Sequence, residues 1–249
     1  MRLRRCFVEE DSLAAGEHLL AGRTARYLSR VLRLQPGQRL VLFDGSGREF
    51  PAEILDIRKK QVRVRLEEGV WVDRESPLAL WLVLGISRPA TMDLAMQKAT
   101  ELGATGIAPA ATARSQNWLP GGGKMSRTSR WQRIAAQAAR QCGRNRVPEI
   151  LPPASFTAAL ERFDDSWFKL IFWEHEVEQG LKEMLRTAGK VRQVCACIGP
   201  EGGFTGEEIE EAASRGFQQA SLGRRILRTE TAVITVLSLL QYEMGDMGF

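Results

Sequence analysis

The feature that most constrains the fold is an alternation of short apolar runs with helical patterns, which starts after residue 77. The runs predicted to be strands are Leu78–Gly85, Gly106–Pro109, Lys169–Phe172, Val194–Ile198 and Gln219–Leu222. The segments predicted to be helices are Met92–Leu102, Arg127–Cys142, Phe156–Arg162, Gly180–Thr187, Glu207–Arg215 and Thr231–Tyr242. Strands that alternate with helices favour a parallel sheet covered by helices, so we expect an α/β fold here.

The first 74 residues follow a different pattern, with strands that are joined by turns. The predicted strands are Leu40–Phe43, Glu49–Ile57 and Gln61–Leu66. Between an earlier strand and Leu40, a short basic helix is expected, whose apolar positions are Leu28, Val31 and Leu32. These elements predict a small β-barrel with one basic helix. The polar stretch 72–77 is the expected linker, which divides the chain into domains 1–74 and 75–249.

Two loops follow predicted strands and lead into predicted helices. The first is Gly199-Pro200-Glu201-Gly202-Gly203, and the second is Leu222–Ala232. Glycines let a ligand approach the backbone, and Thr205 with Glu208 fits a capping box that starts a helix. Open α/β sheets bind ligands at the carboxyl ends of their strands. A plain tight turn explains one such loop, but two loops together favour a ligand site.

The sequence lacks the motifs of several other kinds of binding site and of secreted or membrane proteins. No G-x-G-x-x-G follows the first strand of the α/β part, and the stretch 120–124 fails the P-loop pattern. The four cysteines have no C-x-x-C spacing, so we expect free thiols, no metal site and a reducing cytoplasm. The N-terminus lacks the apolar region of a signal peptide, and no apolar run is long enough to span a bilayer.

The charge distribution indicates a polyanionic partner. The formal net charge is +5, of which residues 1–74 contribute +4 through 15 basic and 11 acidic residues. Residues 102–148 contain no acidic residue, although they carry eight lysines and arginines. A solvated helix usually mixes signs, so this stretch favours RNA or another polyanion. Trp118 and Trp131 lie in it as candidates for base stacking, with packing the more common use.

The two loops also resemble a known family. Ile198–Phe204 and Leu222–Ala232, with Gln97–Gly103 and Ala138–Glu149 upstream, are similar to the bacterial 16S ribosomal RNA uridine-N3 methyltransferases of the SPOUT class. The resemblance covers nearly the whole chain in order. It implies a SPOUT-type parallel sheet with a C-terminal trefoil knot, preceded by a PUA-like β-barrel that binds RNA. It also implies S-adenosylmethionine as the methyl donor and a homodimer.

The resemblance further implies which residues form the site. Arg228 would stabilise the uridine anion, with Glu230 or Glu201 as base or orienting partner. The cofactor would contact Phe172, Trp173, Glu174, Ile198, Gly199, Pro200, Glu201, Gly202, Gly203, Leu222, Gly223, Ile226, Leu227, Arg228, Thr229, Thr231 and Ala232. RNA would contact Arg4, Arg5, Arg26, Arg33, Arg88, Arg114, Arg140, Arg144 and Arg146. The chain departs from many relatives at Arg88, where they carry a lysine-glycine loop, and at Tyr27, where they often carry histidine.

Three functions remain open at this stage. The first is methylation of N3 of the uridine at position 1498 of 16S ribosomal RNA, as free RNA or in the assembled small subunit. The second is a SPOUT enzyme that acts on another RNA position or on a ribose 2′-hydroxyl. The third is an RNA-binding module without catalysis. The apolar stripe Val233, Val236, Leu237 and Leu240 is expected to supply either a dimer surface or internal core.

Overall fold

The computed structural model describes residues 4–8, 13–58, 60–115, 124–174 and 180–248. Trp118, His175 and the glycine-rich part of the stretch 120–124 therefore lie outside the described residues. The chain forms two compact units. Unit 1 comprises Met1–Glu75 together with Ala139–Val147, and unit 2 comprises Ser76–Ala138 and Pro148–Phe249. The segment 139–147 thus groups with the N-terminal part, which a single division at residue 74 does not anticipate.

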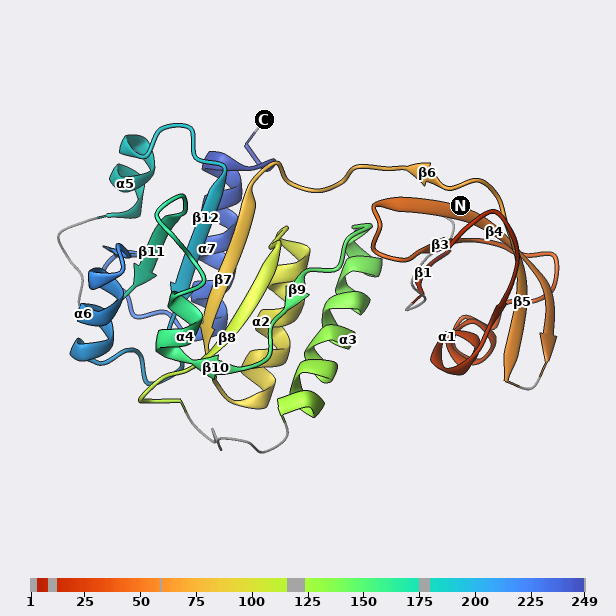
Figure 1. Ribbon diagram of the computed structural model, residues 1–249, viewed down its shortest axis with the longest axis horizontal. Coiled ribbons are helices and arrows are strands. Elements are labelled where there is room, and N and C mark those ends of the chain that lie inside the picture. The colour runs from red at the N-terminus through yellow and green to blue at the C-terminus, as the bar shows by residue number, and fades with distance from the viewer. Residues whose placement is uncertain (1–3, 9–12, 59, 116–123, 175–179, 249) are drawn as a thin grey trace. The chain divides into compact units, whose positions relative to one another are not determined.

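Unit 1 is built on a six-stranded, mainly antiparallel sheet with the order β1-β3-β4-β5-β2, and β6 pairs with β4 (Figure 1). Its strands are β1 Arg4–Phe7, β2 Gly16–Leu20, β3 Arg39–Phe43, β4 Arg48–Arg58, β5 Gln61–Leu66 and β6 Val70–Trp71. Three of these confirm the predicted strands 40–43, 49–57 and 61–66. Alternate residues of β5 are buried, because Val62, Val64 and Leu66 enter the core while Arg63 and Arg65 face outward.

The predicted basic helix has a more complex form. A short α1, Gly22–Arg26, continues directly into a π-helical turn η1, Tyr27–Val31. The backbone N–H of Leu32 donates to the carbonyl of Tyr27, five residues earlier, at 2.9 Å. The wider turn buries Leu28 but leaves Val31 66% exposed, so the expectation that Val31 packs on the apolar face is wrong. Helical spacing of 3.6 residues does not hold through a π-turn.

Unit 2 contains a seven-stranded sheet whose neighbouring strands pair in parallel, as the alternation predicted. The strand order is β10-β8-β7-β12-β11-β13, and β9 pairs with β8. The strands are β7 Ala79–Gly85, β8 Gly106–Ala111, β9 Glu149–Ile150, β10 Ala154–Ser155, β11 Phe168–Phe172, β12 Gln193–Ile198 and β13 Gln218–Ala220. Because β7 and β12 are neighbours, the loops that follow them meet at one edge of the sheet.

Helices accompany the strands of unit 2. They are α2 Pro89–Glu101, α4 Phe156–Leu160, α5 Leu181–Thr187, α6 Gly206–Ser214 and α7 Thr229–Met244. Helix α3, Lys124–Cys142, begins in unit 2, and its residues from Ala139 onward belong to unit 1. Residues of α4 and α6 join one core cluster with Cys195 and Cys197 of β12. Helices α2 and α7 pack against each other on one face of the sheet (Figure 1).

The apolar stripe of α7 is internal core. Val233, Val236, Leu237 and Leu240 are each 0% exposed within this chain. The alternative that this stripe supplies a dimer surface is therefore wrong. Among the described residues, no helix has both the length and the apolar character needed to cross a membrane.

Candidate functional site

A large pocket lies at the carboxyl ends of the parallel strands of unit 2. It has a volume of about 950 Å³ and is lined by the residues that follow β7, β11, β12 and β13. Its lining residues are Arg88, Thr91, Phe172, Trp173, Glu174, Gly180, Ile198, Gly199, Pro200, Glu201, Gly203, Phe204, Ser221, Leu222, Gly223, Arg224, Arg225, Ile226, Leu227, Arg228, Thr229, Glu230 and Ala232. Both loops singled out in the sequence therefore meet in one cavity, at the edge where open α/β sheets bind ligands.

The loop between β12 and α6 depends on glycine at two positions. Gly203 closes a turn with a hydrogen bond from its N–H to the carbonyl of Pro200 at 2.9 Å, and its φ is +70°. A Cβ at Gly203 would lie 2.5 Å from Oε1 of Glu174. A Cβ at Gly199 would lie 3.3 Å from the backbone of Gly203. A side chain at Gly203 would displace Glu174, and one at Gly199 would crowd the turn, so glycine suits both positions.

Helix α6 begins with the predicted capping box. The hydroxyl of Thr205 accepts a hydrogen bond from the N–H of Glu208, and the carboxylate of Glu208 accepts one from the N–H of Thr205 at 2.9 Å. The other oxygen of Glu208 accepts the N–H of Ala113, 2.7 Å away in the loop after β8. Glu208 is 7% exposed, so these bonds satisfy a buried carboxylate and fix the end of the loop.

The carboxylate of Glu201 binds the start of α2. It accepts hydrogen bonds from the N–H of Arg88 at 3.1 Å and from the hydroxyl of Thr91 at 3.0 Å. Burial raises the pKa of Glu201, but bonds from backbone N–H groups and from the hydroxyls of Thr91 and Ser87 outweigh burial and hold its pKa below the usual range. Glu201 is therefore ionised at neutral pH, and it caps a helix as well as lining the pocket.

The loop between β13 and α7 is tied to the first loop through Thr229. The hydroxyl of Thr229, which is 5% exposed, donates to the carbonyl of Gly199 at 3.2 Å. Arg228, the N-cap residue of α7, is exposed, and Glu230 lies in the first helical turn. Arg228 and Glu230, two of the three candidate catalytic residues, therefore flank a residue whose side chain is hydrogen-bonded to the first loop, and both line the pocket.

The pocket brings together most of the residues predicted to contact a cofactor. All of them line it except Gly202 and Thr231. Gly202 contacts the loop after β8, where Nη1 of Arg114 donates a hydrogen bond to the carbonyl of Gly202 at 2.8 Å. Thr231 is exposed on α7. For every residue of the set, contact with a cofactor stays a prediction.

Some lining residues were not predicted. Arg224 and Arg225 belong to the second loop, and Phe204 and Ser221 each adjoin one of the two loops, so their place in the sequence was a usable signal. Thr91 follows β7 and reaches the pocket because β7 pairs with β12, and Gly180 reaches it through a parallel bridge with Ser221. The sequence alone carries no signal for either residue. Arg88 was predicted to contact RNA, and it also lines the pocket.

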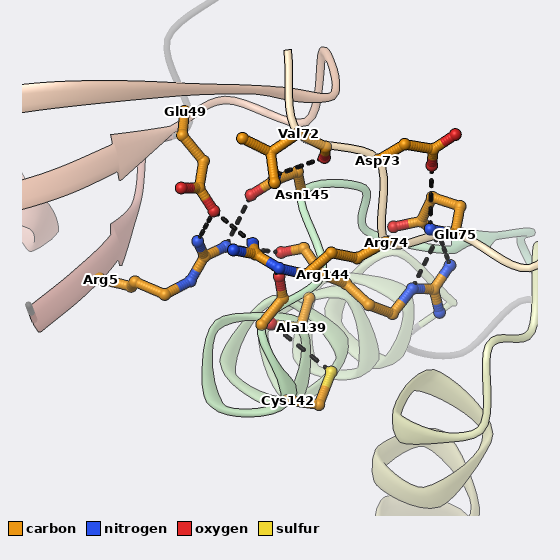
Figure 2. Close-up of polar contacts among 11 residues, drawn as sticks. Arg5, Glu49, Val72, Asp73, Arg74, Glu75, Ala139, Cys142, Arg144 and Asn145 are labelled. Carbon is orange, nitrogen blue, oxygen red and sulfur yellow. Dashed lines mark hydrogen bonds and ion pairs between the residues drawn. The ribbon is translucent and has the colours of Figure 1, made fainter. Parts of the chain in front are cut away.

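The arginines predicted to bind RNA have different environments in unit 1. Arg5 and Arg144 are buried, with side chains 9% and 8% exposed, and they form ion pairs with Glu49 and Glu75 (Figure 2). Arg4 donates to the carbonyl of Leu32. Arg26 and Arg33 are exposed. The contacts of Arg5 and Arg144 support a structural role, and RNA contact stays a prediction for the whole set.

Arg140 and Arg146 lie on aromatic rings of unit 1. The guanidinium carbon of Arg140 is 4.2 Å from the ring centroid of Tyr27, and that of Arg146 is 5.7 Å from the ring centroid of Trp71. Both distances fall within the range of cation–π attraction. In the part of the chain that the structure describes, no cluster of three or more metal-ligating side chains occurs.

Comparisons with known proteins agree with this architecture. Residues 74–241 match the family described as RNA methyltransferase domain, and residues 20–67 match the RNA methyltransferase PUA domain. Ribosomal RNA small subunit methyltransferase E of Buchnera aphidicola subsp. Acyrthosiphon pisum is 31% identical over 98% of this chain and 95% of the relative. The Bacillus subtilis protein of the same name is 29% identical over 97% of each chain. The crystal structure of ribosomal RNA small subunit methyltransferase E from Neisseria gonorrhoeae bound to S-adenosyl methionine has a TM-score of 0.88 and 32% identity, covering 98% of this chain and 99% of that chain.

Proposed function

Since the chain belongs to the family of ribosomal RNA small subunit methyltransferase E, we propose that it transfers a methyl group from S-adenosylmethionine to 16S ribosomal RNA. The observation that carries the proposal is the pocket, which combines carboxylates and arginines. Glu174, Glu201 and Glu230 line it together with Arg224 and Arg228. Carboxylates suit a ligand with a cationic sulfonium and ammonium, and arginines suit the phosphates of RNA.

The size of the pocket supports a small-molecule ligand. Its volume of about 950 Å³ lies within the range of roughly 300 to 1,000 Å³ that is usual for such sites. A Cβ at Gly203 would meet Glu174, so a side chain there would change the shape of this wall. We propose that the backbones at Phe172–Glu174, Ile198–Gly203 and Leu222–Ala232 hold the cofactor. When bound, S-adenosylmethionine supplies an electrophilic methyl group.

The proposed target is N3 of the uridine at position 1498. Because N3 carries a proton in free uridine, the enzyme must remove or share that proton before the nitrogen can attack the methyl group. We assign Glu230 as the base and Arg228 as the cation that stabilises negative charge on the uracil oxygens. Glu201 is ionised and bound to α2, so it orients the loop rather than taking the proton.

The finer features of the family are part of the same proposal. We propose that residues 1–74 form a PUA-like, RNA-binding β-barrel and that residues 75–249 form a SPOUT domain with a C-terminal trefoil knot. We also propose a homodimer in the cytoplasm that uses no metal. On α7, Leu239 and Tyr242 are 40% and 60% exposed, so they supply apolar surface for a partner subunit.

Two substitutions test the assigned chemistry. Arg228→Ala should lower kcat for RNA methylation about 100-fold or more, and Glu230→Gln should do so about 100-fold. The measurement is single-turnover methylation of small subunits that lack the modification, with cofactor affinity determined in parallel. Glu243→Gln is the matched control, because Glu243 is exposed near the other end of α7. Near wild-type rates in both variants would remove these roles.

Product analysis separates the proposal from its alternatives. Nucleosides recovered after reaction should contain 3-methyluridine. A ribose-methylated nucleoside or another methylated base would favour a different SPOUT activity. RNA binding without cofactor binding would favour a module that lacks catalysis.

A further inference from the structure

Strand β6 of unit 1 presents two large apolar side chains to solvent. Val70 is 55% exposed and Trp71 is 54% exposed. The strand pairs with the start of β4, where Arg48 is opposite Trp71. The indole packs on Gly47, because a Cβ there would lie 2.8 Å from the ring. The tryptophan is thus held in a defined position, although more than half of its surface is exposed.

The backbone of this region is fixed by buried polar contacts. The N–H of Val72 donates to the carbonyl of Gly47 at 3.2 Å, and the side-chain amide of Asn145 donates to the carbonyl of Val72 at 2.9 Å (Figure 2). Arg5 in turn donates to Oδ1 of Asn145 at 2.6 Å. Asn145 is 1% exposed. These contacts connect the segment after β6 with the segment 139–147 inside unit 1.

Arg146 lies next to this network in sequence and differs from its arginines in charge pairing. Arg5 and Arg74 pair with Glu49, and Arg144 pairs with Glu75. Arg146 is exposed, and among the described residues no carboxylate forms an ion pair with it. Its guanidinium carbon lies 5.7 Å from the centroid of Trp71, near the outer limit of cation–π attraction. The guanidinium is therefore available to an anion beside the ring.

We propose that Trp71 and Arg146 form a binding site for an unpaired nucleotide of the RNA substrate. The base stacks on the indole, and the guanidinium contacts the adjacent phosphate. Aromatic faces bind unpaired bases with little sequence preference, and arginine beside such a face adds charge and stacking. The inference rests on the proposed function, because that function supplies RNA as the ligand. It assigns this contact to a pair of side chains outside the methyltransferase pocket.

The test is a titration of the full-length protein with a short single-stranded RNA oligonucleotide at fixed salt, followed by fluorescence anisotropy. Trp71→Ala should weaken binding roughly tenfold. Trp71→Phe should retain most of the affinity, since phenylalanine keeps a face for stacking. Arg146→Gln should weaken binding and reduce the slope of log K against log salt concentration by about 0.7. Leu19→Ala is the matched control, because Leu19 is 55% exposed on β2.

Thermal unfolding shows whether Trp71→Ala remains folded, and if it does not, Trp71→Phe and Arg146→Gln carry the test. Unchanged RNA affinity in Trp71→Ala and Arg146→Gln would overturn the site. So would a loss of methylation on assembled subunits with unchanged affinity for RNA, because that result indicates a protein partner. Binding of S-adenosylmethionine and methylation by the wild-type protein are measured separately. Their failure would remove the proposed function, and the RNA titration would still decide the Trp71–Arg146 site.

Discussion

The hydrogen bonds of the Glu201 carboxylate determine how strong a base this residue is. A general base is most effective when its pKa lies near the working pH. Burial raises the pKa of Glu201, but hydrogen bonds from its own N–H, from the N–H of Arg88 and from the hydroxyls of Thr91 and Ser87 outweigh burial. Its pKa therefore lies below the usual range, which makes this carboxylate a weak base. The sequence offered two carboxylates for this role, and the proposal assigns it to Glu230 because Glu201 is already bound to Arg88 and Thr91. Arg88 and Thr91 fix Glu201 from a segment more than a hundred residues away, so sequence alone could not make this choice.

At Gly203, one methyl group should disturb the cofactor site. Gly203→Ala places a side chain at φ +70° and a Cβ 2.5 Å from Oε1 of Glu174. The strain costs about 1 kcal/mol or more, and Glu174 must move. We expect the affinity for S-adenosylmethionine, measured by calorimetric titration, to fall at least about tenfold.

Gly206→Ala is the control for this prediction. Gly206 starts α6 three residues later, and a Cβ there would meet nothing within 4 Å. This variant should bind the cofactor as the wild type does. Equal affinities of Gly203→Ala and wild type would show that the wall formed by Gly203 and Glu174 is not needed for binding.

At the scale of secondary-structure elements, hydrophobic periodicity predicted the strands and helices of unit 2 well. Each predicted strand overlaps an observed one, and α7 forms despite its β-branched residues because Val233 and Val236 are buried in the core. The π-turn Tyr27–Val31 could not be predicted, since no composition signal marks an insertion of this kind. The two-residue strands β6, β9 and β10 are also too short to show a period.

The cap of α6 gives a prediction at this scale. Thr205→Ala removes the acceptor for the N–H of Glu208 and should lower the free energy of unfolding by about 1 kcal/mol. Denaturant unfolding of the purified protein measures the change. Thr205→Ser keeps the hydroxyl and should cost much less. Equal losses for the two variants would show that the methyl group of Thr205, and not its hydroxyl, stabilises the helix.

At the scale of the whole molecule, unit 1 is assembled from two distant stretches of chain. The contacts that join them are polar and partly buried: Arg5 donates to Asn145, and Arg74 donates to the carbonyl of Gly143 at 2.9 Å. Composition predicted a polyanionic partner for the basic stretch 102–148, and the family resemblance named Arg5 and Arg144 among the RNA contacts. The pairing of Arg5 with Glu49 and of Arg144 with Glu75 depends on the tertiary fold, which periodicity and charge counts do not encode. RNA contact by these two arginines stays a prediction.

The Glu49 carboxylate should make the stability of the protein depend on pH. Burial raises its pKa, but the hydrogen bond from Arg74 and the charge of Arg5 outweigh burial, so its pKa is lowered from 4.5. A carboxylate whose pKa is lowered by folding stabilises the folded state fully when the pH is above its unfolded-state pKa. This stabilisation is lost as the pH falls through its folded-state pKa. Glu49→Gln should therefore destabilise the protein by about 2 kcal/mol at pH 7 and by less as the pH falls below about 4.5.

Glu67→Gln provides the comparison, because Glu67 pairs with Arg39 at the surface, where the side chains are 55% and 67% exposed. Such exposed pairs contribute about 1 kcal/mol or less. Chemical denaturation at several pH values measures both variants. A Glu49→Gln cost that is as small as that of Glu67→Gln at pH 7 would contradict the role of the buried network.

The inclusion of residues 139–147 in unit 1 also sets an order of events during biosynthesis. Residues 1–75 leave the translating ribosome first, but Arg5 acquires Asn145 as a partner only after a further 72 residues, 76–147, have been made. At ordinary elongation rates this takes about 4 to 14 seconds. The part of the protein that is synthesised first therefore reaches its final form only after a large portion of the second unit has been translated.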